Sequence, residues 1–154
     1  MNYQDYLNKR REEFEALPIW FAFGQRQFDE AMIEHGLQPT DTDKIYRLSD
    51  TGGFYKREDA AIIKAFFDSG SYLETLMGDG AFREDAFYYE MGNHEYAINW
   101  QGDWDVCSCF GGCEWSEEKT YVEYLQELGH PEWVPQYRKA KKRHMRYAIE
   151  NEWV

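Results

Sequence analysis

The residues with the most obvious chemical potential are three cysteines close together in the chain, Cys107, Cys109 and Cys113. Thiolates are common zinc ligands, and His94 or His130 could supply a fourth donor. Zinc sites, however, usually pair their cysteines two to four residues apart within each half of the site, and a single C-x-C step does not match that spacing. The sequence therefore favours a structural role for the cysteines over a metal site.

The cysteines are expected to be reduced packing residues. They are odd in number and lie in one short stretch, which is a poor framework for disulfides. On a short helix, Cys107 would share a buried face with Val106 and Phe110. We therefore expect a fold that needs no metal, no disulfide and no cofactor.

A second candidate is the segment Asn93-His94-Glu95-Tyr96, which places a histidine beside a carboxylate. Such a pair could perform general acid–base chemistry. The segment lacks the second histidine of an H-E-x-x-H zinc helix, because position 98 is Ile. The structural alternative is that Asn93 caps a helix end while His94 or Glu95 bonds the backbone of the turn. We favour that alternative and keep residues 93–96 as a candidate functional loop.

Other catalytic signatures are missing from the sequence. The pairs Gly52-Gly53 and Gly111-Gly112 are followed by no Gly-Lys-Ser/Thr, so they are turn glycines rather than phosphate loops. There is no Gly-x-Ser-x-Gly segment. We assign no catalytic residue and expect that the chain is not an enzyme.

Charge restricts the class of partner more strongly than any motif. The 154 residues carry a net charge of −12, and residues 138–154 hold six Arg or Lys against two Glu, so the remaining chain carries −16. This charge repels nucleic-acid phosphates and favours a basic protein surface instead. The candidate contact residues are acidic side chains at helix starts or in loops: Asp41, Asp43, Glu84, Asp85, Glu117 and Glu118.

The basic face of the last helix has two interpretations. It could bind nucleic acid, since Arg and Lys on one helical face can follow phosphates, or it could lie against the acidic body of the same molecule, which we favour. No apolar run approaches the roughly 20 residues that cross a bilayer, and the N-terminus is polar. We expect a cytoplasmic protein that does not enter a membrane.

The first half of the chain is expected to combine helices with a small sheet. Predicted elements are a helix over 2–17, a strand Ile19–Phe23 covered on both faces, a helix Gln25–His35, and a hairpin of Lys44–Leu48 with Phe54–Lys56. Gly36 is expected to be a left-handed helix cap, with Leu37 folded back onto the last turn. The next helix, Glu58–Asp68, would bury a wide stripe of Ile62, Ile63, Phe66 and Phe67 and end at Gly70.

The second half is expected to be mostly helical. A short helix covers Tyr72–Met77, Glu84–Met91 is a helix or a strand, and Tyr96–Trp100 is a strand. Asp103 is expected to cap a short helix that ends at Gly111, and Ser116 is expected to start the next helix. The long last helix, about 132–152, would bury Tyr137, Ala140, His144 and Ala148. The predicted fold is a single α+β domain, 1–154, with three or four short strands in an antiparallel or mixed sheet and five to seven helices.

Four segments carry a family resemblance: Trp20–Met32, Asp41–Tyr46, Gly52–Phe54 and Asn93–Tyr96. Together they resemble a domain family of unknown function that is encoded by phages, plasmids and other mobile elements of bacteria. The likeness covers most of residues 1–110, and the cysteines and the basic last helix lie outside it. The resemblance implies a bacterial cytoplasm as the setting but brings no activity with it.

Three functional hypotheses follow from the sequence. The first is an acidic protein that binds a basic, nucleic-acid-binding protein and inhibits a host defence nuclease, in the manner of anti-CRISPR or anti-restriction proteins; its setting rests on the resemblance. The second is a small-molecule or nucleotide-binding module. The third is an enzyme of unfamiliar type that uses His94 and Glu95.

Overall fold

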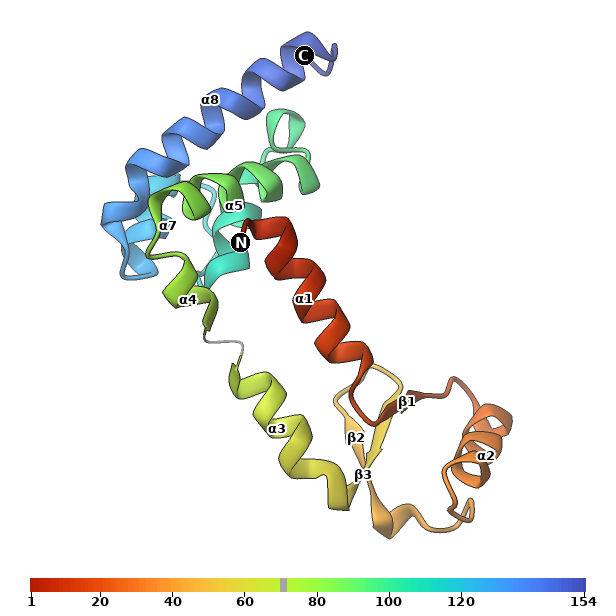
Figure 1. Ribbon diagram of the computed structural model, residues 1–154. Coiled ribbons are helices and arrows are strands. Elements are labelled where there is room, and N and C mark those ends of the chain that lie inside the picture. The colour runs from red at the N-terminus through yellow and green to blue at the C-terminus, as the bar shows by residue number, and fades with distance from the viewer. Residues whose placement is uncertain (70–71) are drawn as a thin grey trace. The chain divides into compact units, whose positions relative to one another are not determined.

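The computed structural model describes residues 1–69 and 72–154 and divides into two compact units (Figure 1). The first unit comprises Met1–Lys9 with Ser71–Val154, and the second comprises Arg10–Gly70. The division does not test whether the two units fold as one domain, so the single-domain expectation stays a prediction. Gly70, the predicted end of a helix, lies outside the described residues.

The sheet of the second unit follows the prediction. Its strands are β1 (Ile19–Phe21), β2 (Ile45–Leu48) and β3 (Gly53–Lys56), arranged in the order β1-β3-β2. Both pairings are antiparallel, with Trp20 opposite Phe54 and Tyr46 opposite Tyr55. The predicted hairpin of β2 and β3 is therefore confirmed, and β1 pairs with the other edge of β3.

The helix α2 (Gln25–Glu34) supplies the small core of this unit. Met32 is fully buried and packs with Trp20 and Ile45. Gly36 has a φ of +77°, and the Leu37 amide donates to the Met32 carbonyl at 2.8 Å. This is the predicted helix-ending motif, in which a left-handed glycine satisfies the last carbonyls.

Two burial predictions in the second unit are wrong. β1 is covered on one face only, because Trp20 is buried whereas Phe21 is 45% exposed. After the 3₁₀ turn Arg57–Asp59, helix α3 (Ala60–Asp68) buries Ile63, but Ile62 and Phe67 are more than half exposed. Folded proteins leave much apolar surface exposed, so the apolar stripe of the sequence does not by itself define the buried face of α3.

The first unit is built around two helices, α5 (Gly80–Asn93) and α8 (Val134–Glu150). Tyr137, Ala140, His144 and Ala148 of α8 are buried as predicted. The Phe87 ring of α5 lies 5.1 Å from the Tyr137 ring, edge to face. Around this pair are the N-terminal end of α1 (Tyr3–Glu15), α4 (Tyr72–Leu76), α6 (Gly102–Cys107), α7 (Tyr121–Glu127) and the 3₁₀ helices η4 (Tyr96–Ile98), η5 (Ser108–Phe110) and η6 (Pro131–Trp133).

Three local predictions in the first unit are wrong. The expected strand Tyr96–Trp100 is the 3₁₀ turn η4. Asp103 lies inside the first turn of α6, where its carboxylate accepts from the Tyr96 hydroxyl at 2.5 Å and from the Tyr137 hydroxyl at 2.8 Å, so it does not cap the helix. The helix expected from Ser116 begins at Tyr121.

The start of α7 is decided by a better cap further along the chain. The Thr120 and Glu123 side chains form a reciprocal capping box, which satisfies two unpaired backbone donors at once.

The predicted fold class is confirmed: an α+β chain with a small antiparallel sheet, several helices and a long C-terminal helix. Within residues 1–69 and 72–154, no helix combines the length and the apolar composition needed to cross a membrane.

Candidate functional site

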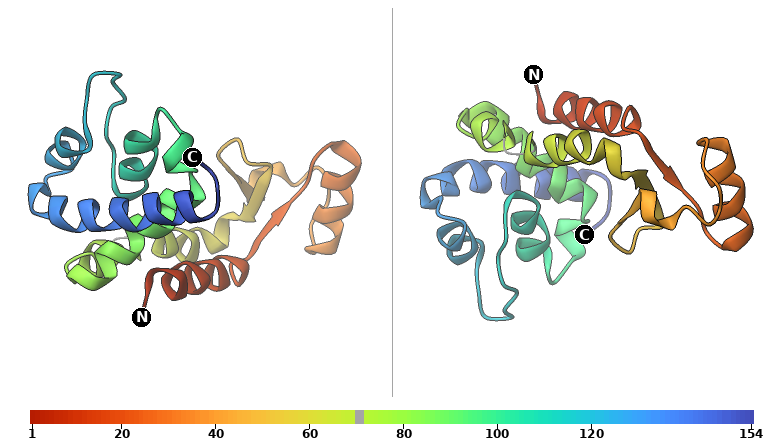
Figure 2. Two further views of the ribbon diagram at one scale, coloured as in Figure 1. Left: turned by 90° about the horizontal axis from the view of Figure 1, so that it is seen from above. Right: turned by 90° about the horizontal axis from the view of Figure 1, so that it is seen from below.

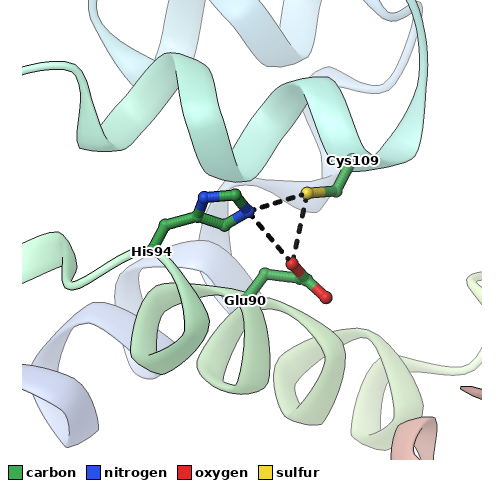
Figure 3. A group of neighbouring side chains, drawn as sticks. All are labelled: Glu90, His94 and Cys109. Atoms are coloured by element: carbon green, nitrogen blue, oxygen red, sulfur yellow. Dashed lines mark hydrogen bonds and ion pairs between the residues drawn. The ribbon is translucent and has the colours of Figure 1, made fainter.

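A cluster of three ionisable side chains lies between α5 and η5 in the first unit. Glu90 of α5 and His94, the residue at the C-terminal cap of α5, are one turn apart and project from the same face. Cys109 of η5 meets them from the opposite side (Figure 3). The Cys109 Sγ atom is 3.2 Å from Glu90 Oε2 and 3.5 Å from His94 Nε2. The third side of the triangle, His94 Nε2 to Glu90 Oε2, measures 3.3 Å.

Glu90 is buried, which is uncommon for a carboxylate, and hydrogen bonds offset the cost of its burial. Only 5% of the residue is exposed. The Tyr3 hydroxyl donates to Oε1 at 3.0 Å, and Asn93 Nδ2 donates to Oε2 at 3.4 Å. Burial, followed by the Glu90 charge, raises the pKa of Tyr3, so the phenol keeps the proton that it donates.

The thiol of Cys109 is protonated at neutral pH. Burial is the largest cause and the Glu90 carboxylate the next, and together they raise the pKa of Cys109 to about 12. The thiol donates to Glu90 Oε2 and lies 3.2 Å from the Asp105 carbonyl oxygen. A reactive cysteine needs a lowered pKa and electropositive surroundings. The raised pKa of Cys109 and the adjacent Glu90 carboxylate therefore do not support a nucleophilic thiol. The cluster does bring together one sulfur, one nitrogen and one oxygen donor that could hold a metal ion.

The structure changes the predicted partner of His94. Asn93 ends α5, and Glu95 follows His94 with a φ of +52° and an exposed side chain. The carboxylate beside the imidazole is therefore Glu90 rather than Glu95. Sequence reasoning missed Glu90, although the spacing Glu90-x-x-x-His94 identifies it if the helix predicted over 84–91 extends to a cap at His94.

The other predicted cysteine and histidine partners lie elsewhere. Cys107 is fully buried in the core, as expected, and Cys113 is half-buried. His130 stacks on Trp133 with ring centroids 3.8 Å apart, and its Nδ1 and Nε2 atoms lie 2.8 Å from Glu132 and 3.2 Å from Glu74. His130 is thus held by two carboxylates rather than by cysteines.

Three of the six predicted contact carboxylates have internal partners. Asp85 accepts from the Tyr3 amide at 3.1 Å, and Glu84 lies 3.3 Å from Arg143. Asp41 accepts from the Gln38 amide at 2.9 Å and lies 3.7 Å from Lys44. Each of these three side chains therefore has a partner within its own unit, and its role as a contact residue stays a prediction.

The remaining three, Asp43, Glu117 and Glu118, are exposed, and no salt bridge among the described residues involves them. Asp41 and Asp43 belong to the second unit, and the other four belong to the first.

The basic face of α8 is mostly free to meet solvent. Arg143 pairs with Glu84, and its guanidinium lies 4.1 Å from the centre of the Tyr88 ring. Arg138 Nε donates to the Tyr121 hydroxyl at 2.9 Å. Lys139, Lys142 and Arg146 are exposed. Among the described residues, the expected pairing of this face with acidic side chains is seen for Arg143 alone.

Sequence reasoning also missed an exposed tryptophan pair. Trp100 is 77% exposed and Trp115 is 42% exposed, and their rings meet edge to face with centroids 5.9 Å apart. Trp115 lies two and three residues before Glu117 and Glu118 in the loop between η5 and α7, which projects from the helices of its unit (Figure 2). We call Trp100, Trp115, Glu117 and Glu118 the Trp–Glu surface.

The loop that carries Trp115, Glu117 and Glu118 is anchored at several points. Trp104 Nε1 donates to the Cys113 carbonyl at 2.9 Å. The Tyr124 hydroxyl accepts from the Ser116 amide at 3.2 Å and donates to the Ser116 carbonyl at 2.8 Å. Lys119 reaches Glu127 at 2.8 Å. The loop is therefore held in place on both sides of Trp115.

A comparison with models of protein families shows which family the chain belongs to. The model of a family of unknown function matches residues 2–117. The chain belongs to DUF7659, a family of unknown function. The DUF7659 range contains Glu90, His94 and Cys109 as well as both tryptophans of the surface, and it ends before α7 and α8. It also includes the cysteines, which the sequence analysis had placed outside the resemblance.

Neither the curated proteins nor the solved structures gave a significant match. Membership of DUF7659 brings no activity with it, so the expectation that the chain is not an enzyme stays a prediction.

Proposed function

We propose that the chain acts by binding another protein, and that the Trp–Glu surface offers acidic and aromatic side chains to a basic surface that normally receives nucleic acid. The observation that carries the proposal is the exposed Trp100–Trp115 pair beside two carboxylates that pair with no cation among the described residues. Contiguous exposed apolar patches often mark interaction sites, and tryptophan is enriched among the residues that dominate binding energy.

The anchoring of the loop supports a role in binding. A partner that docks on a mobile loop must offset the conformational entropy lost when that loop is ordered. Here the bonds from Tyr124 to Ser116 and from Trp104 to Cys113 hold the loop before a partner arrives. The edge-to-face contact restrains the two indole rings as well.

The charge around the surface indicates a cationic partner. Residues 74–132 contain fourteen acidic and only two basic side chains. A surface of this sign attracts a basic protein over a distance set by the salt concentration and repels nucleic acid. Nucleic-acid-binding proteins present the complementary basic surface.

The finer proposal concerns the identity of the partner. We place the chain in a bacterial cytoplasm as a protein of a phage, plasmid or other mobile element, where it inhibits a host defence nuclease of the CRISPR or restriction type. Two features support this setting: the acidic charge, which resembles that of a nucleic acid, and the resemblance of the quoted segments to a family of mobile elements.

The test is inhibition of purified CRISPR effectors and restriction endonucleases, measured as DNA cleavage at several salt concentrations. We expect Trp100→Ala with Trp115→Ala to raise the inhibitory concentration at least tenfold, which corresponds to about 1.4 kcal/mol. We expect Glu117→Gln with Glu118→Gln to slow association and to reduce its salt dependence.

The matched control is Glu150→Gln with Glu152→Gln, which removes two exposed carboxylates near the C-terminus and should change little. Circular dichroism and melting temperature would verify the fold of each variant. Inhibition that is unchanged in both surface variants, or absent for the wild type with every nuclease, would contradict the proposal.

The small-molecule alternative is favoured by a groove in the second unit. It lies between the N-terminus of α2 and the hairpin, and its lining includes Gly24, Phe28, Arg47, Ser49 and Phe54. A nucleotide that raises the melting temperature of the wild type but not of Arg47→Gln would support this function. The enzyme alternative would require turnover that is lost in His94→Ala while the fold is retained.

A further inference from the structure

We propose that Glu90, His94 and Cys109 form a mononuclear zinc site with three protein ligands and an open fourth position. This proposal does not rest on the protein-binding function, and it assigns a metal site to the first unit. It departs from the sequence-based expectation that the fold has no metal site and that His94 is structural. Among the cysteines it concerns Cys109 alone, because Cys107 remains a core residue and Cys113 lies outside the cluster.

The distances between the donor atoms fit a tetrahedral ion. Zinc binds sulfur at about 2.3 Å and nitrogen or oxygen at about 2.0–2.1 Å, so tetrahedral angles separate the donors by about 3.3–3.6 Å. The observed separations are 3.5 Å from sulfur to nitrogen, 3.2 Å from sulfur to oxygen and 3.3 Å from nitrogen to oxygen. An ion could therefore be bound with changes of a few tenths of an ångström.

The chemistry of the donors selects zinc among the common cations. Magnesium and calcium prefer sites made wholly of oxygen ligands, whereas thiolate and imidazole ligands favour zinc. A thiolate and a carboxylate balance the two positive charges of the ion when the imidazole is neutral. On binding, the Cys109 thiol loses its proton to solvent as the sulfur–zinc bond forms. Three protein ligands with an open fourth position are typical of zinc sites that bind water or substrate.

Surrounding hydrogen bonds hold the ligands in position. The Tyr3 hydroxyl occupies Oε1 of Glu90 and so directs Oε2 toward the cluster. Asn99 Nδ2 donates to the His94 carbonyl at 3.0 Å and to the Asp105 carboxylate at 2.7 Å, which joins the end of α5 to the segment that carries Cys109. Partners of this kind orient the ligands of a metal, and their loss typically lowers metal affinity by about 10–100-fold.

The experiment uses the full chain, reduced and stripped of metal with a chelator. Zinc is titrated against a chromophoric competitor, and cobalt(II) is added separately as a spectroscopic probe. We expect one ion per chain, a sulfur-to-cobalt charge-transfer band in the near ultraviolet, and intense visible bands of a tetrahedral site. Cys109→Ser and His94→Ala should each lower zinc affinity by at least about 100-fold, since losing a ligand costs more than losing an orienting partner.

Two control variants separate this site from other donors. Cys113→Ser removes a half-buried thiol outside the cluster, and His130→Ala removes a histidine that lies beside two carboxylates. Both should bind zinc as the wild type does. A wild type that binds zinc no more tightly than Cys109→Ser, or binding that is lost in His130→Ala instead, would overturn the proposal. Circular dichroism of every variant without metal shows whether a loss of affinity reflects unfolding.

If Cys109→Ser or His94→Ala fails to fold, the cobalt spectrum of the wild type still decides. Absence of the sulfur-to-cobalt charge-transfer band would overturn the site, because the proposed site includes a bond between Cys109 Sγ and the metal.

Discussion

Replacing Tyr3 by Phe should destabilise the first unit by removing one hydroxyl from a buried carboxylate. That hydroxyl donates to Glu90 Oε1 at 3.0 Å, and it joins the start of α1 to α5. The ring itself is retained in the variant, so its contacts with Phe82, Tyr89 and Phe110, at centroid distances of 6.0, 5.4 and 5.9 Å, should persist. The change therefore measures the hydrogen bond rather than a cavity.

The expected magnitude follows from the surroundings of the carboxylate. A hydrogen bond to a charged group contributes about 1.5–3 kcal/mol, and Glu90 keeps two other donors, Cys109 and Asn93. We therefore expect a loss of about 1.5–2 kcal/mol in the free energy of unfolding. For a chain of this size, that loss corresponds to a fall of about 3–8 °C in the melting temperature.

Urea denaturation and calorimetry at pH 7 provide the measurement, with Tyr89→Phe as the control. Tyr89 is 36% exposed and touches the Tyr3 ring, but its hydroxyl has no hydrogen bond to a described residue. A double-mutant cycle with Glu90→Gln isolates the pair. The reasoning is refuted if Tyr3→Phe costs less than about 0.5 kcal/mol, or if its cost is the same in the Glu90→Gln background.

Three further predictions follow from the burial of particular residues. Burial lowers the pKa of His144, whose Nε2 accepts from the Ala97 amide at 3.1 Å. Between the lowered pKa of the folded chain and the ordinary value, the imidazole is protonated in the unfolded chain but neutral in the folded one. The free energy of unfolding should therefore fall as the pH drops below about 6.5, by at most about 1.4 kcal/mol per pH unit, and level off below the folded pKa. His144→Gln should remove this part of the pH dependence in urea titrations between pH 7.5 and 5. Ile63→Ala should cost about 2–4 kcal/mol, whereas Phe67→Ala, at a position 52% exposed, should cost less than about 1 kcal/mol; equal costs would contradict the observed face of α3. Since Glu90 and Cys109 are hydrogen-bonded without a metal, the chelator-treated, reduced chain should keep its helical circular dichroism and melt cooperatively; a disordered spectrum would show that folding requires the metal.

The parts of the fold that the sequence predicts are those set by local chemistry. Gly36 and Leu37 form their helix-ending motif because a glycine at positive φ and a following apolar residue are sufficient to specify it. The hairpin follows in the same way from its loop glycines. The buried face of α8 follows from the helical spacing of Tyr137 and Ala148.

The parts that could not be predicted depend on neighbours far away in the sequence. The segment Tyr96–Trp100 alternates like a strand, yet Tyr96 is held by Asp103 and its backbone folds into a 3₁₀ turn. In the sequence, Glu90 has no feature that separates it from an ordinary surface carboxylate of a helix. Its burial depends on Tyr3, 87 positions earlier, whose hydroxyl donates to it. Cys109 was judged by its spacing to other cysteines, whereas its relevant neighbours are a histidine and a glutamate.

The proposed zinc site and the Trp–Glu surface are connected through the chain. Trp100 follows His94 by six residues, and Trp115 follows Cys109 by six residues, so each proposed ligand leads into the segment that carries one indole ring. Asn99, directly before Trp100, bonds both the His94 carbonyl and Asp105. A metal that joins His94 to Cys109 would therefore restrain the bases of both tryptophan-bearing segments.

If both proposals hold, zinc should alter the environment of the tryptophan pair. We expect zinc to change the intrinsic fluorescence of the wild type, and we expect this change to be absent in Cys109→Ser. Because Trp20, Trp104, Trp133 and Trp153 also emit, subtraction of the signal from Trp100→Phe with Trp115→Phe would isolate the pair. Partner affinity would then increase with zinc, and by thermodynamic reciprocity the partner would strengthen zinc binding by the same factor. A cobalt spectrum that reports the site while the emission of the pair stays constant would show instead that the metal and the surface act independently.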